Sequence, residues 1–512
     1  MNSDARQQTK SENHNVTRAA GVVGAATLLS RIFGYVRDMV FASFFGAGMA
    51  ADAFIAAFRI PNLLRRREDG LRLAVSALKL LLVSLSVIAI IGVVAAPIII
   101  KTVAPGFSNP PEKMALTVVL TRIMFPYVIL IGLVALCMGI LNVMGHFAAP
   151  AIAPVLLNLA MIGSVFAVSR LSDSETVQVM GLAGGVLVGG VLQLALQLPY
   201  LVKHGIRFWK KSGLWHPGMR KVGLLMLPTI FGAAVYQINI LVGTLLASLL
   251  PQGSVSYLYY ADRLVQFPLG IFAQAAATAV LPSLSRQAAN GDHAGLGDTF
   301  GHAMSLVLFI TIPAMVGLIV LRDPIVALLF KRGAFDAQTT RLTSDALLYY
   351  ALGLWAFSAV RIVVSTFYAM QDTRTPVIAA TVSIVANILI GIALMGPMKH
   401  CGLALATSLA SMVNLFILVV VLRKRLGMVR WRPIFSSCLR TLAASGMMAL
   451  GVVMTCRILI PPETGLGKLQ LLTGISAGVI GGSIIFFAAA WMMKIPEWRK
   501  VLGLMNRSLN RS

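Results

Sequence analysis

Charged residues are scarce in this sequence. They make up 12% of its 512 residues, whereas a soluble domain carries about 25%. Hydrophobic residues account for 58%, the mean hydropathy is +0.84, and no polar stretch is long enough to form a separate soluble domain. The composition therefore excludes a soluble protein and predicts a chain that crosses a membrane many times.

Acidic residues and cysteines are the rarest polar groups. There are 18 Asp and Glu against 43 Lys and Arg, for a formal net charge of +25. In a membrane protein such an excess marks cytoplasmic loops, so no nucleic-acid partner is expected. The four cysteines stand alone in apolar segments and lack the paired spacing of a disulfide framework or a metal site. They are Cys137, Cys401, Cys438 and Cys456.

Catalytic and nucleotide-binding motifs are missing as well. The sequence has no Ser-His-Asp order, no H-E-x-x-H and no Walker motif. Its glycine-rich runs at 181–190 and 474–483 lie in apolar segments without a Lys-Ser/Thr ending, so they predict helix-packing surfaces. We therefore expect no enzyme, no cofactor and no bound metal. Uphill transport would draw on an ion gradient, the membrane potential or a downstream sink.

Long apolar runs, by contrast, are frequent. A membrane-spanning helix needs about 20 mostly apolar residues, and the chain has about 14 candidates. Basic residues concentrate in every second gap and in the tails, which places both termini in the cytoplasm; Lys331, Arg332 and Arg341 go against this pattern. The candidates are 19–45, 50–66, 73–104, 114–143, 147–169, 176–202, 223–250, 254–285, 300–321, 343–369, 375–396, 401–422, 435–460 and 469–493.

The sequence also repeats itself weakly. Residues 141–154 are echoed by 367–380 at an offset of about 226 residues, with Met144 matching Met370. A second echo places Ala42 over Ala247 at an offset of about 205 residues. This order predicts two six-helix halves followed by two extra helices. The change of offset means that the first half lacks about 20 residues after Arg66, so the second crossing is short, about 25 Å.

Ionised residues inside apolar runs are the first functional candidates, because each costs a few kcal/mol at bilayer depth. Arg31, Arg37 and Asp52 belong to such runs near the N-terminus, and Arg263 holds a related place in the second half. Arginines in a water-filled pocket suit a phosphate or pyrophosphate, which the guanidinium binds in bidentate fashion. The alternative is that each arginine pairs with a nearby carboxylate or helix end, or extends to the interface. For Arg361 and Arg122 we favour that alternative, with positions near helix ends.

Several longer motifs carry a family resemblance. In order they are SRIFGYVRD, FGAGMAADAFIAAFRIPNLLRR, YYADRLVQFPLG, TAVLPSLS, LFKRGAF and FYAMQDTRTPV. With these motifs the chain resembles the MurJ (MviN) lipid II flippases of the multidrug/oligosaccharidyl-lipid/polysaccharide exporter superfamily. The resemblance covers nearly the whole chain after Val22 and implies an all-α polytopic membrane protein. About 14 transmembrane helices would form two pseudo-symmetric six-helix lobes around a central cationic cavity, with two extra C-terminal helices.

The resemblance also implies a function and a set of binding residues. The protein would flip undecaprenyl-pyrophosphate-linked peptidoglycan precursor, lipid II, across a bacterial inner membrane by alternating access. It would act as a monomer among membrane lipids. The expected regions are a disordered tail at 1–18, an N-lobe at 19–202, a basic linker at 203–222, a C-lobe at 223–422, a lipid-tail groove at 423–493 and a cytoplasmic tail at 494–512. The expected substrate-binding residues are Arg31, Arg37, Asp52, Arg65, Arg66 and Arg263.

Two departures from the family pattern keep other functions open. Relatives continue after NLLRR with a stretch resembling FAEGAFSQAFVP, which this chain lacks, so a transport-inactive membrane scaffold is one alternative. Some relatives bind sodium through an Asp in the seventh helix, whereas 229–248 contains no acidic residue, so dependence on membrane potential is the better expectation. The remaining alternative is a flippase for another polyprenyl-linked glycan, or a drug exporter of the same superfamily.

Overall fold

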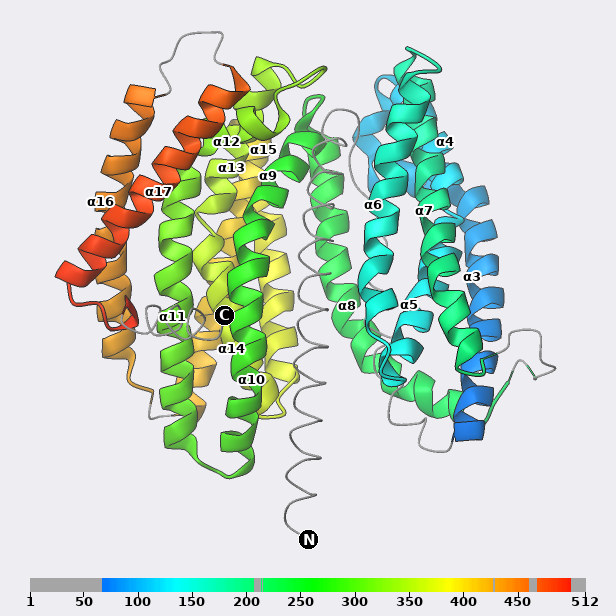
Figure 1. Cartoon of the computed structure of the whole chain (residues 1–512), viewed down its shortest axis with the longest axis horizontal. Helices are drawn as coiled ribbons and strands as arrows, with labels where there is room; N and C mark the ends of the chain where they lie inside the picture. Colours follow the sequence, from blue (N-terminus) through cyan, green and yellow to red (C-terminus); the bar gives the residue numbers. More distant parts are fainter. Residues whose placement is uncertain (1–66, 207–212, 214, 427–428, 460–466, 499–512) are drawn as a thin grey trace. The chain divides into compact units, whose positions relative to one another are not determined.

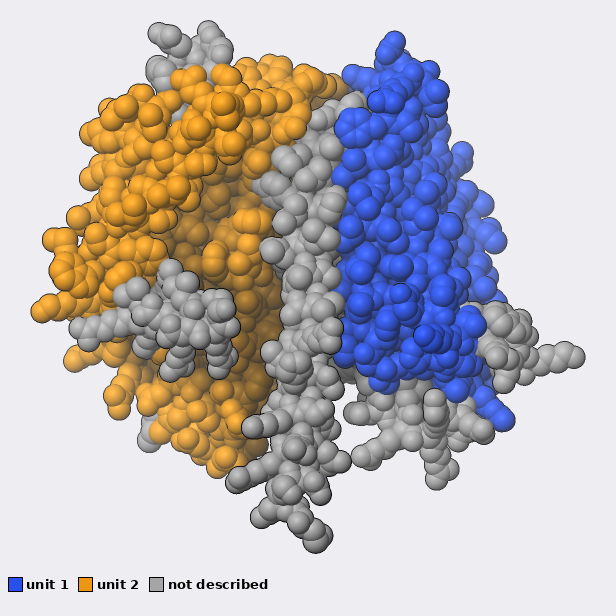
Figure 2. All heavy atoms as spheres, in the orientation of Figure 1, with its two compact units in different colours: residues 1–238 blue, residues 239–512 orange. Residues whose placement is uncertain are grey.

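A computed structural model describes residues 67–206, 213, 215–426, 429–459 and 467–498. Within these ranges the chain is helical and contains no strand. Contacts divide the chain into two compact units, residues 1–238 (unit 1) and 239–512 (unit 2), shown in different colours in Figure 2. The border lies inside helix α8 (Gly218–Ser248), and the lobe and linker bounds expected from the sequence remain predictions.

Unit 1 is built from long helices (Figure 1). They are α3 (Arg67–Val103), the short 3₁₀ helix η2 (Pro105–Ser108), α4 (Pro111–Met124), α5 (Tyr127–Val143), α6 (Ala148–Ser169), α7 (Glu175–Lys203) and the first part of α8. Unit 2 continues from α8 with α9 (Ser254–Pro268), the π-helix η3 (Leu269–Ala273), α10 (Gln274–Ala289), α11 (His293–Val320), α12 (Arg322–Phe330), α13 (Ala337–Ala351), α14 (Leu354–Ala369), α15 (Arg374–Leu426), α16 (Trp431–Leu459) and α17 (Lys468–Met492).

The apolar segments predicted from 73–104 onward all coincide with helices in the described residues. By length and composition nine of these helices can cross a membrane, or up to ten if the bent pair α13 and α14 forms one span. Segments 375–396 and 401–422 both fall in α15, whose backbone leaves the helical region at Lys399, with φ 51° and ψ −132°. Thus α15 is two helices that meet where the sequence predicts a gap. The segments 19–45 and 50–66, including the short second crossing, lie outside the described residues.

The surface of α3 shows why these helices need lipid. Ile90, Val94 and Ile98 repeat at every fourth position and are 65%, 72% and 72% exposed. Exposure of such an apolar stripe to water would cost free energy, whereas contact with lipid acyl chains would not. The opposite side of α3 supplies Ala74, Val75 and Leu78 to the buried core of unit 1.

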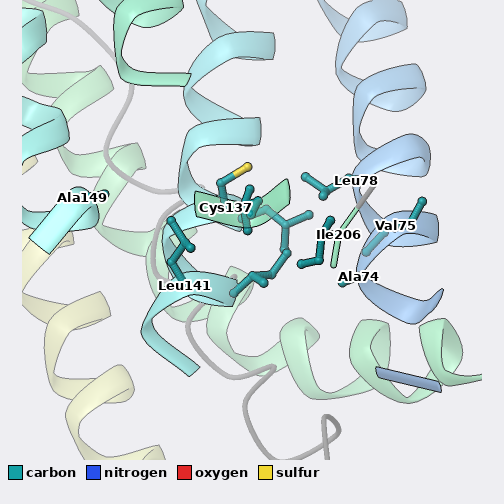
Figure 3. Close-up of a cluster of buried hydrophobic side chains, with 11 residues drawn as sticks. Ala74, Val75, Leu78, Cys137, Leu141, Ala149 and Ile206 are labelled. Atoms are coloured by element: carbon teal, nitrogen blue, oxygen red, sulfur yellow. The ribbon is translucent and has the colours of Figure 1, made fainter. Parts of the chain in front are cut away.

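The core of unit 1 joins α3, α5 and the residues that follow α7. Figure 3 shows Leu78, Cys137, Leu141 and Ile206 gathered in this core, and Cys137 is fully buried. Helices α6 and α7 approach each other closely, because a Cβ on Gly189 would lie 3.0 Å from the Leu157 Cα atom. The run 181–190 therefore packs helices, as its sequence predicts. In unit 2 the corresponding core joins α11, α16 and α17 and includes Phe309, Met448 and Phe486.

The two similar sequence segments 141–154 and 367–380 each begin with a turn of the same backbone geometry. We call these turns corner 1 (residues 141–146) and corner 2 (residues 367–372). Gly145 and Gln371 occupy equivalent places and both have positive φ, 78° and 60°. The amide of His146 donates to the Leu141 carbonyl, and the amide of Asp372 donates to the Phe367 carbonyl, each at 2.9 Å. This pairing closes the end of a helix in a Schellman motif. The two echoed segments therefore share the same local chain geometry, and the two six-helix halves expected from the repeat remain a prediction.

Candidate functional site

Arg263 is the one expected binding residue within the described part of the chain. Arg31, Arg37, Asp52, Arg65 and Arg66 lie outside it, so their roles remain predictions. Arg263 is on α9, a helix of the membrane-spanning segment Ser254–Ala289, and is half-buried. The structure therefore places its guanidinium where the sequence expects it, inside a span and away from the helix ends.

Tyr259 positions the Arg263 side chain from one turn earlier on α9. The Arg263 Nη2 atom donates to the Tyr259 hydroxyl at 3.2 Å, and the guanidinium carbon lies 5.0 Å from the centre of the Tyr259 ring. Residues four apart on a helix face the same way, so this contact follows from the YYADRL motif itself. A cation held over an aromatic ring keeps its charge and loses side-chain freedom, which prepares it to bind an anion.

Polar groups from three helices lie around Asp262, the residue before Arg263. Gln266 donates a side-chain hydrogen bond to the carboxylate of Asp262, and the Tyr350 side chain of α13 lies near that carboxylate. Tyr350 in turn is hydrogen-bonded to Thr407 of α15. The network fixes α9 against α13 and α15, and the carboxylate beside Arg263 supplies part of its counter-charge. Asp262 was not among the binding residues expected from the sequence.

A second arginine of unit 2, Arg361, contacts the segment that carries Arg263 from another helix. Arg361 occupies the middle of α14, so the expected position near a helix end is wrong for this residue. Its Nη1 atom donates to Oε1 of Gln274, the first residue of α10 after the π-helix η3. π-Helical turns are rare and occur frequently at functional sites. The position of Arg361 was misjudged because the unbroken apolar run 343–369 hides the bend between α13 and α14, which measures 42°; its expected role in structural pairing agrees with the contact to Gln274.

A pair of amide side chains joins the seventh predicted span, 223–250, to α15. Asn387 of α15 donates to the Oδ1 atom of Asn239 of α8 at 2.9 Å. The two amides satisfy each other, which is the usual arrangement of polar side chains between transmembrane helices. Among the residues that the structure describes, no three His, Cys, Asp or Glu side chains are grouped as a metal site would require.

Comparison with known proteins identifies the family of this chain. The sequence model of the family described as lipid II flippase MurJ matches residues 67–473. A probable lipid II flippase MurJ of Vibrio cholerae is 37% identical over 430 residues, which cover 78% of this chain and 81% of the relative. The lipid II flippase MurJ of Burkholderia cenocepacia is 33% identical over 509 residues, which cover 94% of this chain and 98% of the relative.

Solved structures give the same answer for the fold. A lipid II flippase MurJ in an inward closed conformation aligns with a TM-score of 0.71 at 26% identity, over 92% of this chain and 99% of that one. An inward-facing multidrug resistance transporter of the MATE family aligns with a TM-score of 0.62 at 16% identity, over 80% of this chain and 92% of that one, and supports the fold alone. The chain therefore belongs to the lipid II flippase MurJ family and has the fold of the MOP transporter superfamily.

Proposed function

We propose that this protein moves lipid II, the lipid-linked precursor of peptidoglycan, from the cytoplasmic to the periplasmic leaflet of a bacterial inner membrane. Membership of the lipid II flippase family supports the substrate. The observation that carries the mechanism is Arg263, a guanidinium held on a membrane-spanning helix by Tyr259. Lipid II carries a pyrophosphate, and a permanently charged planar donor is the group best suited to bind it.

The same proposal assigns the rest of the predicted binding set. Arg31, Arg37, Asp52, Arg65 and Arg66 would complete the cationic surface for the pyrophosphate and the sugar-peptide head group. The chain would span the membrane 14 times with both termini in the cytoplasm, and it would work as a monomeric transporter by alternating access. The last two helices, α16 and α17, would receive the polyprenyl tail. Positive-inside charge bias, the internal repeat and the apolar outer face of α16 support these assignments.

The test replaces Arg263 in a strain that depends on this protein alone. A hydrogen bond to a charged group is worth about 1.5–3 kcal/mol, so Arg263→Ala should weaken binding of lipid II about 10- to 100-fold and abolish growth. Arg286→Ala is the matched control, because Arg286 is exposed near the end of α10 and forms no part of the site. Normal growth with Arg263→Ala, at normal protein level, would contradict the proposed mechanism.

Three alternatives are distinguished by growth of the same strain together with ligand-binding measurements. A drug exporter for cationic compounds would bind drug cations in preference to lipid-linked pyrophosphates, and a flippase for another glycan would bind a polyprenyl pyrophosphate with a different sugar. A transport-inactive scaffold would fail to support growth unless the stretch absent after Arg66 is restored. Growth supported by the unmodified chain therefore excludes the scaffold.

A further inference from the structure

The spacing of two exposed arginines on α16 is unusual for a transmembrane helix. Arg440 and Arg457 interrupt its exposed apolar surface, which continues beyond them to Phe435 and Ile458. They are 17 positions apart, which at 1.5 Å per residue is about 25 Å, whereas a hydrocarbon core is about 30 Å thick. The whole helix, Trp431–Leu459, has 29 residues and could span the core with its ends in water. Arg440 is therefore drawn toward the depth at which lipid headgroups meet acyl chains.

The outer face of α16 is left uncovered by the residues of its unit that the structure describes. Figure 1 shows α16 at the edge of unit 2, and α16 packs against α11 and α17 through residues that include Thr441, Ala444 and Met448. On the outer face, Phe435, Leu450 and Ile458 are 72%, 69% and 77% exposed. These side chains identify the surface that meets lipid in the unit as described.

Two guanidiniums lie on this outer side near the start of α16. Arg432 and Arg440 are both exposed, with exposed Ser436 one turn from each. Neither arginine has a hydrogen bond or an ion pair with any described residue. The start of the helix is fixed, because Trp431 packs edge-on against the buried Phe300 of α11 at 5.9 Å between ring centres. Two unpaired cations and a hydroxyl are thus presented together on a rigid helix at the membrane boundary.

We infer that this face of α16, formed by Arg432, Ser436 and Arg440, binds the headgroup phosphate of an anionic phospholipid such as phosphatidylglycerol. The charge of the face is complementary to that lipid, and juxtamembrane arginines each contribute attraction to anionic membranes. The bound headgroup would lie deeper than its neighbours, so the bilayer beside α16 would be locally thinner. This site is separate from the pyrophosphate site at Arg263, and its test does not require transport.

Native mass spectrometry of the full-length protein can measure the preference for dioleoyl phosphatidylglycerol over dioleoyl phosphatidylcholine. We expect Arg440→Gln to reduce the preference about fivefold, and the double variant Arg432→Gln/Arg440→Gln about 25-fold. Arg423→Gln/Lys424→Gln is the control, because it removes two exposed charges from the end of α15 while leaving α16 intact. Equal losses in the control and the double variant would mean that only overall surface charge matters, and would overturn the site.

A second measurement tests the depth of the site. Arg440→Leu lengthens the apolar surface of α16, so its thermal stability should shift in favour of nanodiscs with longer acyl chains, compared with the unsubstituted protein. No change in thickness preference would overturn the proposed thinning. If Arg432→Gln/Arg440→Gln instead converts a dimer to a monomer, the face is a contact between two copies, and the lipid proposal is wrong.

Discussion

Asp372 offers the sharpest test of how corner 2 is stabilised. Its Oδ1 atom accepts the amides of Arg374 and Thr375 at 2.9 and 3.0 Å, which satisfies the exposed start of α15. Its Oδ2 atom accepts the Thr375 hydroxyl at 2.6 Å and the Nη1 atom of Arg425 at 2.8 Å. One carboxylate thus joins the first residues of α15 to its last turn, although Arg374 and Arg425 are 51 positions apart in the sequence.

The magnitudes separate the two roles of this carboxylate. Loss of a side-chain acceptor at a helix start costs about 1 kcal/mol, and an ion pair with an exposed partner contributes at most about 1 kcal/mol. Arg425 is 50% exposed and Asp372 only 10%. Asp372→Ala should therefore lower the free energy of unfolding by about 2 kcal/mol. Asp372→Asn keeps the acceptor and should cost about half as much, like Arg425→Gln.

The pH dependence provides an independent check with a defined sign. Burial alone would raise the pKa of Asp372, but hydrogen bonds from Thr375 and the charge of Arg425 outweigh it and hold that pKa below its usual value. The unfolded carboxyl titrates near 3.9, so its stabilisation is present above about pH 4 and is lost as the pH falls through the lower folded pKa.

Equilibrium unfolding of the solubilised full chain by urea, at pH 7 and between pH 3 and 5, would measure these effects. In 1 M salt the cost of Arg425→Gln should disappear, because the screening length falls to about 3 Å, while the cost of Asp372→Ala should partly remain. Equal destabilisation by Asp372→Asn and Asp372→Ala would refute the division between capping and charge.

The remaining predictions concern unit 1. Gly189→Leu should destabilise the protein by about 1–3 kcal/mol, because its Cβ atom would press on the backbone of Leu157; unchanged thermal unfolding would contradict the close approach of α6 and α7. His146 stacks on Tyr200 at 4.2 Å, and burial, followed by the charges of His204 and Lys203, lowers its pKa. Stability should therefore decrease as the pH falls below about 6.5, and His146→Phe should remove that part of the slope between pH 5 and 7; an unaltered slope would exclude His146 as its source.

The helical organisation could be predicted because a lipid bilayer permits few backbone conformations. Backbone polar groups must be satisfied within each crossing, so an apolar run of sufficient length becomes a helix, and a gap such as that at Lys399 becomes a break. The local pair of Tyr259 and Arg263 was equally accessible, since the helix period alone brings residues four apart together. These features depend on spacing along the chain.

Features that depend on tertiary packing were not accessible. Two side-chain contacts join residues that are far apart in the sequence, Asn239 with Asn387 and Asp372 with Arg425. The sequence around one residue of each pair does not identify the residue that it contacts. The short helix α12 was missed because its 9 residues are too few to register as a span. Arg361 was misplaced for the related reason that packing, rather than composition, bends its segment.

The two corners show what a duplicated chain retains. Their amides form the same hydrogen bonds, although one turn is centred on Gly145 and the other on Gln371. At the next position one has an aromatic stack through His146 and the other an ionic contact through Asp372. The same backbone turn thus carries a histidine in corner 1 and a carboxylate in corner 2, and these two groups titrate in different pH ranges. Mild acidification would therefore weaken the contacts at corner 1 and leave those at corner 2 intact.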